Sequence, residues 1–458
     1  MQKYEKLYAS DSVWKAIAKL SLPSLAIILL MVFYNIADLM FIGQLGSTAM
    51  VAAISLVGPL FSLLMAFATM IGFGGSTRIT NALGRQDLQQ AARISSVCFY
   101  GGLLSGLVLI PVLLAARYPV LCFLGATDET ISYASRYYTI LTLGAPFLLL
   151  STLLGSILRS DGSIKESLVG NISGTIANLV LDPLFILAFD WGVSGAAAAT
   201  VIGNVLSTAI YFLCIRRSKV LSLRPRDARH HMGLLAPVLA LGLPNAVSTL
   251  LSGISSTFAN NLLKSYGTDA IAAMSAAGKV SMLTTMLVMG IAMGCQPLLA
   301  YCHGSGDRKR MRDVLLRLLL LTTVIGAAAA AGSLVGRKAL IGLILKQPGA
   351  ADLAASFVPF LMASAPICGI YYLSVNYLQA SLNAVGASIL SALRQGVILI
   401  PALLGLHALL GINGIVLAHT VSDFASVAAG ILLFVLQVRR NERLDAPVLP
   451  RQKTPAQS

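Results

Sequence analysis

The sequence predicts an all-α integral membrane protein with 12 transmembrane helices, arranged as two parallel six-helix repeats (an N-lobe and a C-lobe) around a central cavity. Hydrophobic residues make up 57% of the 458 residues and charged residues only 11%, too few charges to cover a soluble protein of this length. Long apolar runs alternate with short polar loops, which is typical of helices that satisfy their own backbone hydrogen bonds inside lipid. The runs are continuous, so a β-barrel is disfavoured.

The twelve predicted helices are apolar segments of about 20 residues each. In the first half they start near residues 16, 51, 94, 133, 168 and 193, and in the second half near residues 236, 270, 314, 353, 388 and 414. The first segment is not followed by a cleavage site, so we expect it to be retained as a helix.

The net charge of +15 follows the predicted topology. With the N-terminus inside, the cytoplasmic segments carry 24 Lys and Arg residues and the outer loops carry 5. The positive-inside rule then places both termini in the cytoplasm. We therefore expect the bilayer, and no nucleic acid, as the partner of this basic chain.

The chain repeats itself with a nearly constant spacing, 221 residues between Leu20 and Leu241 and 219 between Gly192 and Gly411. Leu20-Ser21-Leu22-Pro23 matches Leu241-Gly242-Leu243-Pro244, and Gly192 to Ala196 matches Gly411 to Ile415. An even number of helices in each copy keeps the copies in the same orientation. The predicted domains are an N-lobe (1–215), a basic cytoplasmic linker (216–235), a C-lobe (236–437) and a cytoplasmic tail (438–458).

Two aspartates, Asp38 and Asp182, each lie within a long apolar segment of the first half. An ionisable side chain at bilayer depth costs about 2.5–3.5 kcal/mol on insertion scales, and it persists where it faces a protein interior or a water-filled cavity. The equivalent positions in the second half carry Ala259 and Ile400. The acids occur in one lobe only, which indicates an ion site rather than a requirement of the fold.

A stripe of polar residues surrounds the second of these acids. Asn171, Thr175, Asn178 and Asp182 are spaced 4, 3 and 4 residues apart, which places them on one face of a helix. Pro183 removes a backbone donor and frees the carbonyl group of Leu179. Supporting polar residues are expected from the neighbouring helix and from the first helix: Thr200, Asn204, Tyr34 and Asn35.

The chemistry of this stripe leaves two ions open. Carboxylate, amide and hydroxyl oxygens suit Na⁺, which we would place at Asp38, Asn178, Asp182 and Thr200. Alternatively, two close carboxylates do not ionise together easily, so the pair can carry a proton. A polar seam that only joins helices by hydrogen bonds is the structural alternative, and Asn, Ser and Thr often form one in membranes.

Four motifs occur in order along the two repeats: Asp38 before Phe41-Ile42-Gly43-Gln44-Leu45-Gly46, the loop Leu158-Arg159-Ser160-Asp161-Gly162, Asn178 with Asp182-Pro183, and Gly290-x-x-x-Gly294-x-Gln296-Pro297. In this order the chain resembles the multidrug and toxic compound extrusion (MATE) transporters over nearly its whole length, in particular their bacterial MepA/DinF-like branch. The resemblance implies that Asp38 and Asp182 couple transport to a cation, helped by Asn178 and Thr200. Another branch has coupling acids on the helix that begins the second half, where this chain carries Ala259-Asn260-Asn261.

The second half contributes candidates for substrate contact rather than for coupling. Asp423 lies in the last helix and could meet a cationic substrate, while Met289 and Met293 could line an adaptable cavity. No metal site is certain. The sequence contains no nucleotide-binding loop, metalloprotease helix or nucleophile triad, so an enzyme or an ATP-driven pump is disfavoured.

Together, the residues and the resemblance predict a cation-coupled (H⁺ or Na⁺) multidrug antiporter. It would export amphipathic, often cationic drugs or metabolites by alternating access. We expect it in the plasma or inner membrane of a bacterial cell, acting as a monomer, contributing to antibiotic resistance and needing no cofactor beyond the coupling ion. A flippase of lipid-linked saccharides is the alternative, but only Arg136 and Arg394 are available to line its cavity. A membrane enzyme or receptor would need a catalytic or ligand-binding cluster that the sequence lacks.

Overall fold

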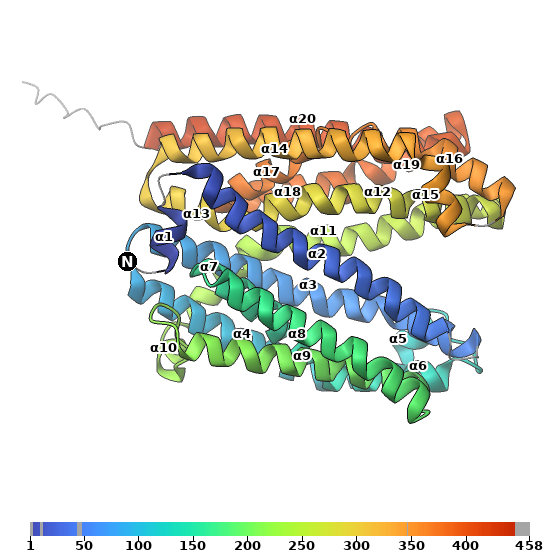
Figure 1. Ribbon diagram of the computed structural model, residues 1–458, viewed down its shortest axis with the longest axis horizontal. Coiled ribbons are helices and arrows are strands. Elements are labelled where there is room, and N and C mark those ends of the chain that lie inside the picture. Colours follow the sequence, from blue (N-terminus) through green and yellow to red (C-terminus); the bar gives the residue numbers. More distant parts are fainter. Residues whose placement is uncertain (1–2, 10–11, 44–47, 346, 445–458) are drawn as a thin grey trace, which may run out of the picture.

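The computed structural model describes residues 3–9, 12–43, 48–345 and 347–444, and its regular elements over these residues are all helices (Figure 1). Side-chain placements are not described for residues 31–48. The long helices run side by side along the long axis of the molecule, with the N-terminus, α10 and α13 at one end and α5, α6, α15 and α16 at the other.

The first half contains the six predicted segments and two short additional helices. Its elements are α1 (Lys3–Tyr8), α2 (Val13–Gly43), α3 (Thr48–Gly84), α4 (Leu88–Ala115), α5 (Arg117–Phe123), α6 (Ile131–Leu143), α7 (Ala145–Ser160), α8 (Ile164–Pro183), the π-helix η1 (Leu184–Ala188) and α9 (Gly192–Arg216). The linker that follows contains α10 (Pro225–Arg229) and the 3₁₀-helix η2 (Met232–Leu234).

The second half repeats this order. Its elements are α11 (Leu235–Leu263), η3 (Lys264–Tyr266), α12 (Thr268–Gly294), α13 (Gln296–Ser305), α14 (Arg308–Val335), α15 (Arg337–Ile344), α16 (Pro348–Met362), α17 (Cys368–Ala380), α18 (Ala384–Ala392), the π-helix η4 (Leu393–Val397), α19 (Leu399–Leu410) and α20 (Ile412–Leu444). The last helix therefore continues past residue 437, where the sequence predicted the tail to begin.

Ten helical segments in the described part of the chain are long and apolar enough to cross a membrane, or eleven if a bent pair of helices is counted as one span. The segment predicted near residue 133 is a pair of helices, α6 and α7, bent by 51°. The segment predicted near residue 353 is divided into α16 and α17. Both breaks lie next to a proline, Pro146 or Pro366, because proline lacks the backbone donor that continues a helix. The twelve predicted segments thus correspond to ten long helices, the bent pair α6 and α7, and the shorter helices α16 and α17.

Matching backbone details fix the register between the two halves. Asp87 accepts a hydrogen bond from the backbone N–H of Gln90 (2.8 Å) and caps α4, and Asp307 caps α14 in the same way through Arg310 (2.9 Å). Gly192 is the first residue of α9, and Gly411 directly precedes α20. Both have positive φ angles, of 53° and 59°. Equivalent positions can therefore be counted from these residues.

The two halves contact each other closely at the end that carries the N-terminus. A Cβ atom on Gly242 of α11 would overlap the carbonyl oxygen of Met70 in α3, and one on Gly304 would overlap the carbonyl oxygen of Asn81. The Gln296 side chain also donates a hydrogen bond to Thr77 across this contact (3.0 Å). Close backbone approach of this kind is how membrane helices pack through small residues.

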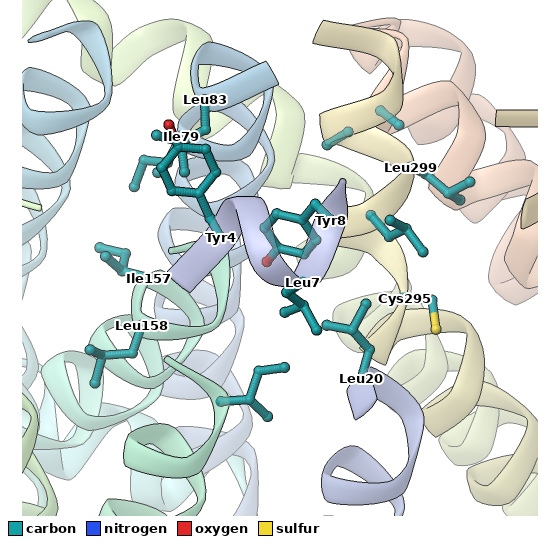
Figure 2. Packing of buried hydrophobic residues seen from close by; sticks show 14 of the residues in the cluster. Tyr4, Leu7, Tyr8, Leu20, Ile79, Leu83, Ile157, Leu158, Cys295 and Leu299 are labelled. Carbon is teal, nitrogen blue, oxygen red and sulfur yellow. The ribbon is translucent and has the colours of Figure 1, made fainter. Parts of the chain in front are cut away.

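Helix α1 lies in this contact between the halves. Figure 2 shows Tyr4, Leu7 and Tyr8 lying between the side chains of α3 and α7 and those of α13. The Tyr8 hydroxyl donates to the carbonyl oxygen of Arg159 (2.6 Å), and its ring centroid lies 5.4 Å from that of Tyr301. Burial raises the pKa of the Tyr8 phenol well above its ordinary value, so it remains a donor. The described residues therefore close the molecule at this end.

Candidate functional site

Asp182 is fully buried near the C-terminal end of α8, and Asn178 lies one turn before it with 4% of its surface exposed. The Asn178 amide nitrogen donates a hydrogen bond to the Thr200 hydroxyl oxygen of α9 (3.3 Å). Thr200 in turn donates to the carbonyl oxygen of Ala196 (3.0 Å). The structure thus brings Asn178 and Thr200 together between α8 and α9, with Asp182 one turn further along α8.

Two glycines allow α8 and α9 to approach closely enough for this contact. A Cβ atom on Gly174 would lie 2.6 Å from the carbonyl oxygen of Gly203, and one on Gly203 would lie 2.7 Å from that of Gly174. Any larger side chain would separate the helices at this level. The polar stripe on α8 therefore depends on small residues as much as on its own polar groups.

A cavity of about 150 Å³ lies beside Asn178 and Thr200. Asn171 and Thr175 line it, as the spacing on α8 predicts, and so does Asn204 of α9. A single water occupies a small fraction of such a volume, so the cavity has room for several water molecules or a partly hydrated ion. Asp182 is one turn away and does not line it.

The Asn178 amide oxygen is the most informative atom of the site. It is buried and accepts no hydrogen bond from the described residues. A buried acceptor without a donor costs about 1–3 kcal/mol. The atom is therefore suited to accept a hydrogen bond from a protonated carboxyl group or to coordinate a cation.

Sequence reasoning missed the contribution of α7. The Ser151 hydroxyl donates to the side-chain oxygen of Asn204 (2.6 Å), whose amide nitrogen donates to the Thr200 carbonyl oxygen (2.8 Å). Ser151 and Thr152 line the cavity together with Ser207 of α9. The adjacent Ser151 and Thr152 in an apolar segment were the sequence feature that could have indicated this contribution. The side of the segment that faces α9 depends, however, on the bend between α6 and α7.

The predicted partners on the first helix, Asp38, Tyr34 and Asn35, lie outside the side chains that the structure describes. Their backbone is part of α2, which packs against α8. The helix that carries Asp38 is therefore a neighbour of the helix that carries Asp182. The pairing of the two acids stays a prediction.

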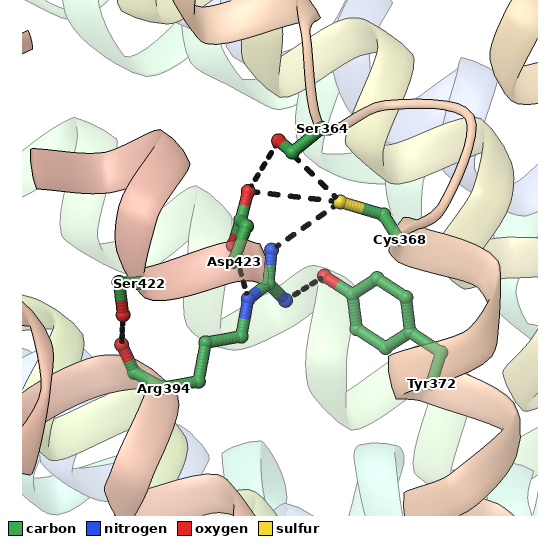
Figure 3. Close-up of polar contacts among 6 residues, drawn as sticks. All are labelled: Ser364, Cys368, Tyr372, Arg394, Ser422 and Asp423. Carbon is green, nitrogen blue, oxygen red and sulfur yellow. Dashed lines mark hydrogen bonds and ion pairs between the residues drawn. The ribbon is translucent and has the colours of Figure 1, made fainter. Parts of the chain in front are cut away.

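The second half places a buried ion pair in the corresponding region (Figure 3). The Arg394 guanidinium donates through Nε to Asp423 (2.7 Å) and through Nη1 to the Tyr372 hydroxyl (2.9 Å). Asp423 also accepts from Ser364 (2.6 Å), and the Arg394 charge lies 4.5 Å from the Tyr371 ring centroid. Only 10% and 17% of the two charged side chains is exposed.

These two residues occupy positions equivalent to members of the N-lobe site. Counted from Gly192 and Gly411, Asp423 corresponds to Asn204. Counted from the N-caps Ser163 and Asn383, Arg394 corresponds to Gly174. The same count places Asp182 opposite Ala402, two residues beyond the Ile400 that the sequence comparison paired with it. The place of the polar N-lobe cavity is thus taken in the C-lobe by a neutralised charge pair. Contact between a cationic substrate and Asp423, as the sequence suggested, would require displacement of Arg394.

We expect the substitution Asp423→Ala to destabilise the protein strongly, because it leaves the Arg394 guanidinium buried without its counterion. Removing one partner of a buried pair costs about 3–5 kcal/mol, whereas replacing both is often neutral. The double variant Arg394→Met/Asp423→Ala should therefore recover most of the loss in thermal unfolding temperature. Asp352→Ala, at an exposed carboxylate of α16, is the control. A single variant as stable as the wild type would show that the pair contributes little.

The remaining candidates for substrate contact, Met289 and Met293, are half-buried on α12. They lie next to Gly290 and Gly294, which contact Ile28 and Ser24 of α2. Their contact with substrate stays a prediction. Among the described residues, no group of three His, Cys, Asp or Glu side chains could hold a metal ion.

Comparison with known proteins agrees with this architecture. The family model described as MatE matches twice, over residues 23–184 and 244–403. The multidrug export proteins MepA of Staphylococcus saprophyticus and Staphylococcus aureus are 32% and 31% identical, each over 95% of this chain and 97% of the relative. A crystal structure of MATE in complex with MaL6 superposes with a TM-score of 0.89 at 24% identity, over 97% of this chain and 99% of that one. A MOP superfamily transporter from Pyrococcus furiosus gives 0.87 at 23% identity, over 96% and 98% of the two chains.

Proposed function

Because this chain belongs to the MATE family of membrane transporters and is not an enzyme, we propose that it is a cation-coupled multidrug antiporter. It exports amphipathic, often cationic compounds from a bacterial cell across the plasma or inner membrane, and both termini lie in the cytoplasm. The curated relatives are named as multidrug export proteins, which supports the substrate class. The structural argument for coupling rests on the N-lobe site.

The observation that carries the proposal is the buried Asp182 with its polar neighbours in one lobe only. A carboxyl group that solvent does not reach takes up or releases a proton or a metal cation only when its surroundings change. Such a change requires two conformational states of the protein. Asn178 and Thr200 provide oxygens one turn away, with a small cavity beside them. The equivalent place in the C-lobe is already neutralised by Arg394 and Asp423. The N-lobe is therefore the half in which a cation can act as the ligand.

Exchange follows if cation and drug stabilise different arrangements of the lobes. A ligand shifts a conformational equilibrium only by its difference in affinity for the two states. The cation would favour one packing of α2 against α8. The drug, bound between the two lobes, would favour the other packing. Closure of the N-terminal end by α1, α3, α11 and α13 represents one of the two states.

We propose H⁺ rather than Na⁺ as the coupling ion. The Asn178 amide oxygen can accept a hydrogen bond from a protonated carboxyl group, and a proton needs no further ligand. Na⁺ would need several oxygens, so Thr200 and Asn178 would have to join Asp38 and Asp182. The two ions can be distinguished by removing those oxygens.

We expect Asn178→Ala to shift the pH dependence of export and to leave Na⁺ without effect. The physical reason is that the substitution removes the acceptor of the protonated acid. The measurement is dye efflux from everted vesicles over a series of pH values, at fixed Na⁺ and with an imposed Na⁺ gradient. Asn413→Ala, at an exposed position in the second half, is the control. Export that follows the Na⁺ gradient at fixed pH and collapses in Asn178→Ala would favour Na⁺ instead.

The flippase alternative is less well supported. A cavity for the pyrophosphate of a lipid-linked saccharide needs free cationic side chains. Arg394 is bound to Asp423, Tyr372 and the Tyr371 ring, and Arg136 is exposed on α6. Neither arginine offers a buried charge to such a ligand in this arrangement.

A further inference from the structure

A groove of about 1090 Å³ lies at the end of the second half that is near the N-terminus and is predicted to be cytoplasmic. It is lined by α14, α17, α20 and the start of α18. Its walls are mostly aliphatic or aromatic, and they include Leu315, Leu319, Leu373 and Phe434. Leu316 of α14 and Ile431 of α20, which also line it, are 54% and 46% exposed. The groove is thus open to the surface that faces the bilayer.

The corresponding cleft of the first half is filled by the chain itself. The linker after α9 runs against α4, where the Ser96 hydroxyl donates to the carbonyl oxygen of Ser222 (2.8 Å). The Ser95 hydroxyl oxygen accepts from the Ser222 backbone N–H (2.9 Å), and Tyr100 donates to the Leu223 carbonyl oxygen (3.2 Å). Three hydroxyl groups of α4 therefore satisfy the backbone of a peptide segment.

The second half has replaced these hydroxyl groups with leucines. Counted from the N-caps Asp87 and Asp307, the positions of Ser95, Ser96 and Tyr100 are taken by three leucines of α14: Leu315, Leu316 and Leu320. Most amide and hydroxyl side chains of the groove already have partners, since Asn383 donates to Gln437 (2.7 Å), Gln437 donates to Asn441 (3.0 Å) and Ser374 donates to the Ile370 carbonyl oxygen (2.8 Å). Among the described residues, the buried Ser381 hydroxyl is one group in the groove without a partner. A peptide backbone in this groove would therefore leave most of its polar groups unpaired. An acyl chain has none to satisfy.

The mouth of the groove is basic. Arg308, Arg312 and Arg440 line it at the end away from the bilayer centre. Arg308 donates to the Asn441 carbonyl oxygen (3.0 Å) and so joins α14 to α20 across the mouth. Arg312 and Arg440 are exposed. Guanidinium groups above an apolar groove complement a phosphate above acyl chains.

We propose that this groove binds an anionic phospholipid of the adjoining membrane leaflet. Arg312 and Arg440 hold the phosphate, and an acyl chain lies along Leu315, Leu319 and Phe434. The lipid fills the cleft that the linker fills in the first half, and so completes the packing of α14 against α20.

The test compares lipid binding to the purified full-length transporter by native mass spectrometry, with phosphatidylglycerol and phosphatidylcholine as probes. We expect phosphatidylglycerol to be retained preferentially. The variant Arg312→Ala/Arg440→Ala should weaken this binding roughly tenfold, because each basic residue near an anionic headgroup contributes to its attraction. The control Lys309→Ala/Arg439→Ala removes the same charge from exposed positions of the same helices that do not line the groove. It should bind phosphatidylglycerol as the wild type does.

A second measurement identifies the occupant directly. A photoreactive benzophenone amino acid in place of Leu316 should give an adduct with the mass of a phospholipid in native membranes. An adduct with residues 445–458 of the chain would overturn the proposal in favour of a peptide occupant. Equal binding of the two lipids, or equal loss in the control variant, would also overturn it.

Discussion

Asp182→Asn is expected to reduce drug export to the level of cells that lack the transporter, while the protein stays folded in the membrane. Asparagine keeps the size of the buried side chain but can neither release a proton nor neutralise a cation. Asp38→Asn should have the same effect if the two acids act together, as the predicted site requires. The measurement is dye efflux and drug resistance in cells, with protein amount and thermal stability determined in parallel.

The control for this experiment is Asp190→Asn. Asp190 is an exposed residue that follows η1 with a positive φ of 54°, a conformation that asparagine also adopts. We expect normal export from this variant. Near wild-type export from Asp182→Asn at normal expression would remove Asp182 from the coupling site.

Gly242→Leu is the second substitution for which we expect a large effect. A Cβ atom at this position would already overlap the Met70 carbonyl oxygen, so a leucine has no space while α3 and α11 are in contact. The closed arrangement of the N-terminal end should become unfavourable, and the lobes should be held apart there. Alternating access needs both arrangements, so export should be lost although the helices still insert.

This effect can be observed without transport. Cysteines placed in α3 and α11 near the contact should become more accessible to a water-soluble thiol reagent in Gly242→Leu than in the parent. Gly332→Leu is the matched control, since a Cβ atom on Gly332 of α14 would meet no neighbouring atom within 4 Å and a leucine there projects into open space. Unchanged labelling together with normal export in Gly242→Leu would show that this contact is not part of the transport cycle.

Much of the helical architecture could be predicted from the sequence, because hydrophobic length and the repeat between halves determine it. The spacing predicted that Asn171, Thr175, Asn178 and Asp182 share one face of α8; the first three line one cavity, and Asp182 does not line it. The two broken segments were predicted as continuous helices. Their hydrophobic length is sufficient, and local proline effects such as those at Pro146 and Pro366 decide where a helix ends.

Contacts between distant segments could not be predicted from the sequence. The hydrogen bond between Ser151 and Asn204 depends on how α7 packs against α9, which helix periodicity does not specify. The ion pair between Arg394 and Asp423 likewise depends on the packing of η4 against α20. The linker fills the cleft beside α4 in the first half and not the groove beside α14 in the second half. This difference likewise became apparent only when the position of the linker was known.

We propose that drug and cation compete through the N-lobe site around Asp182, and proton release on drug binding tests this competition most directly. Purified transporter in a weakly buffered detergent solution is mixed with a cationic drug while a pH indicator or a Na⁺ electrode records the released ion. If the N-lobe site couples transport, drug binding should release protons from the wild type, and the signal should disappear in Asp182→Asn while drug still binds. Ion release of wild-type size from Asp182→Asn would show that Asp182 does not couple drug binding to the cation.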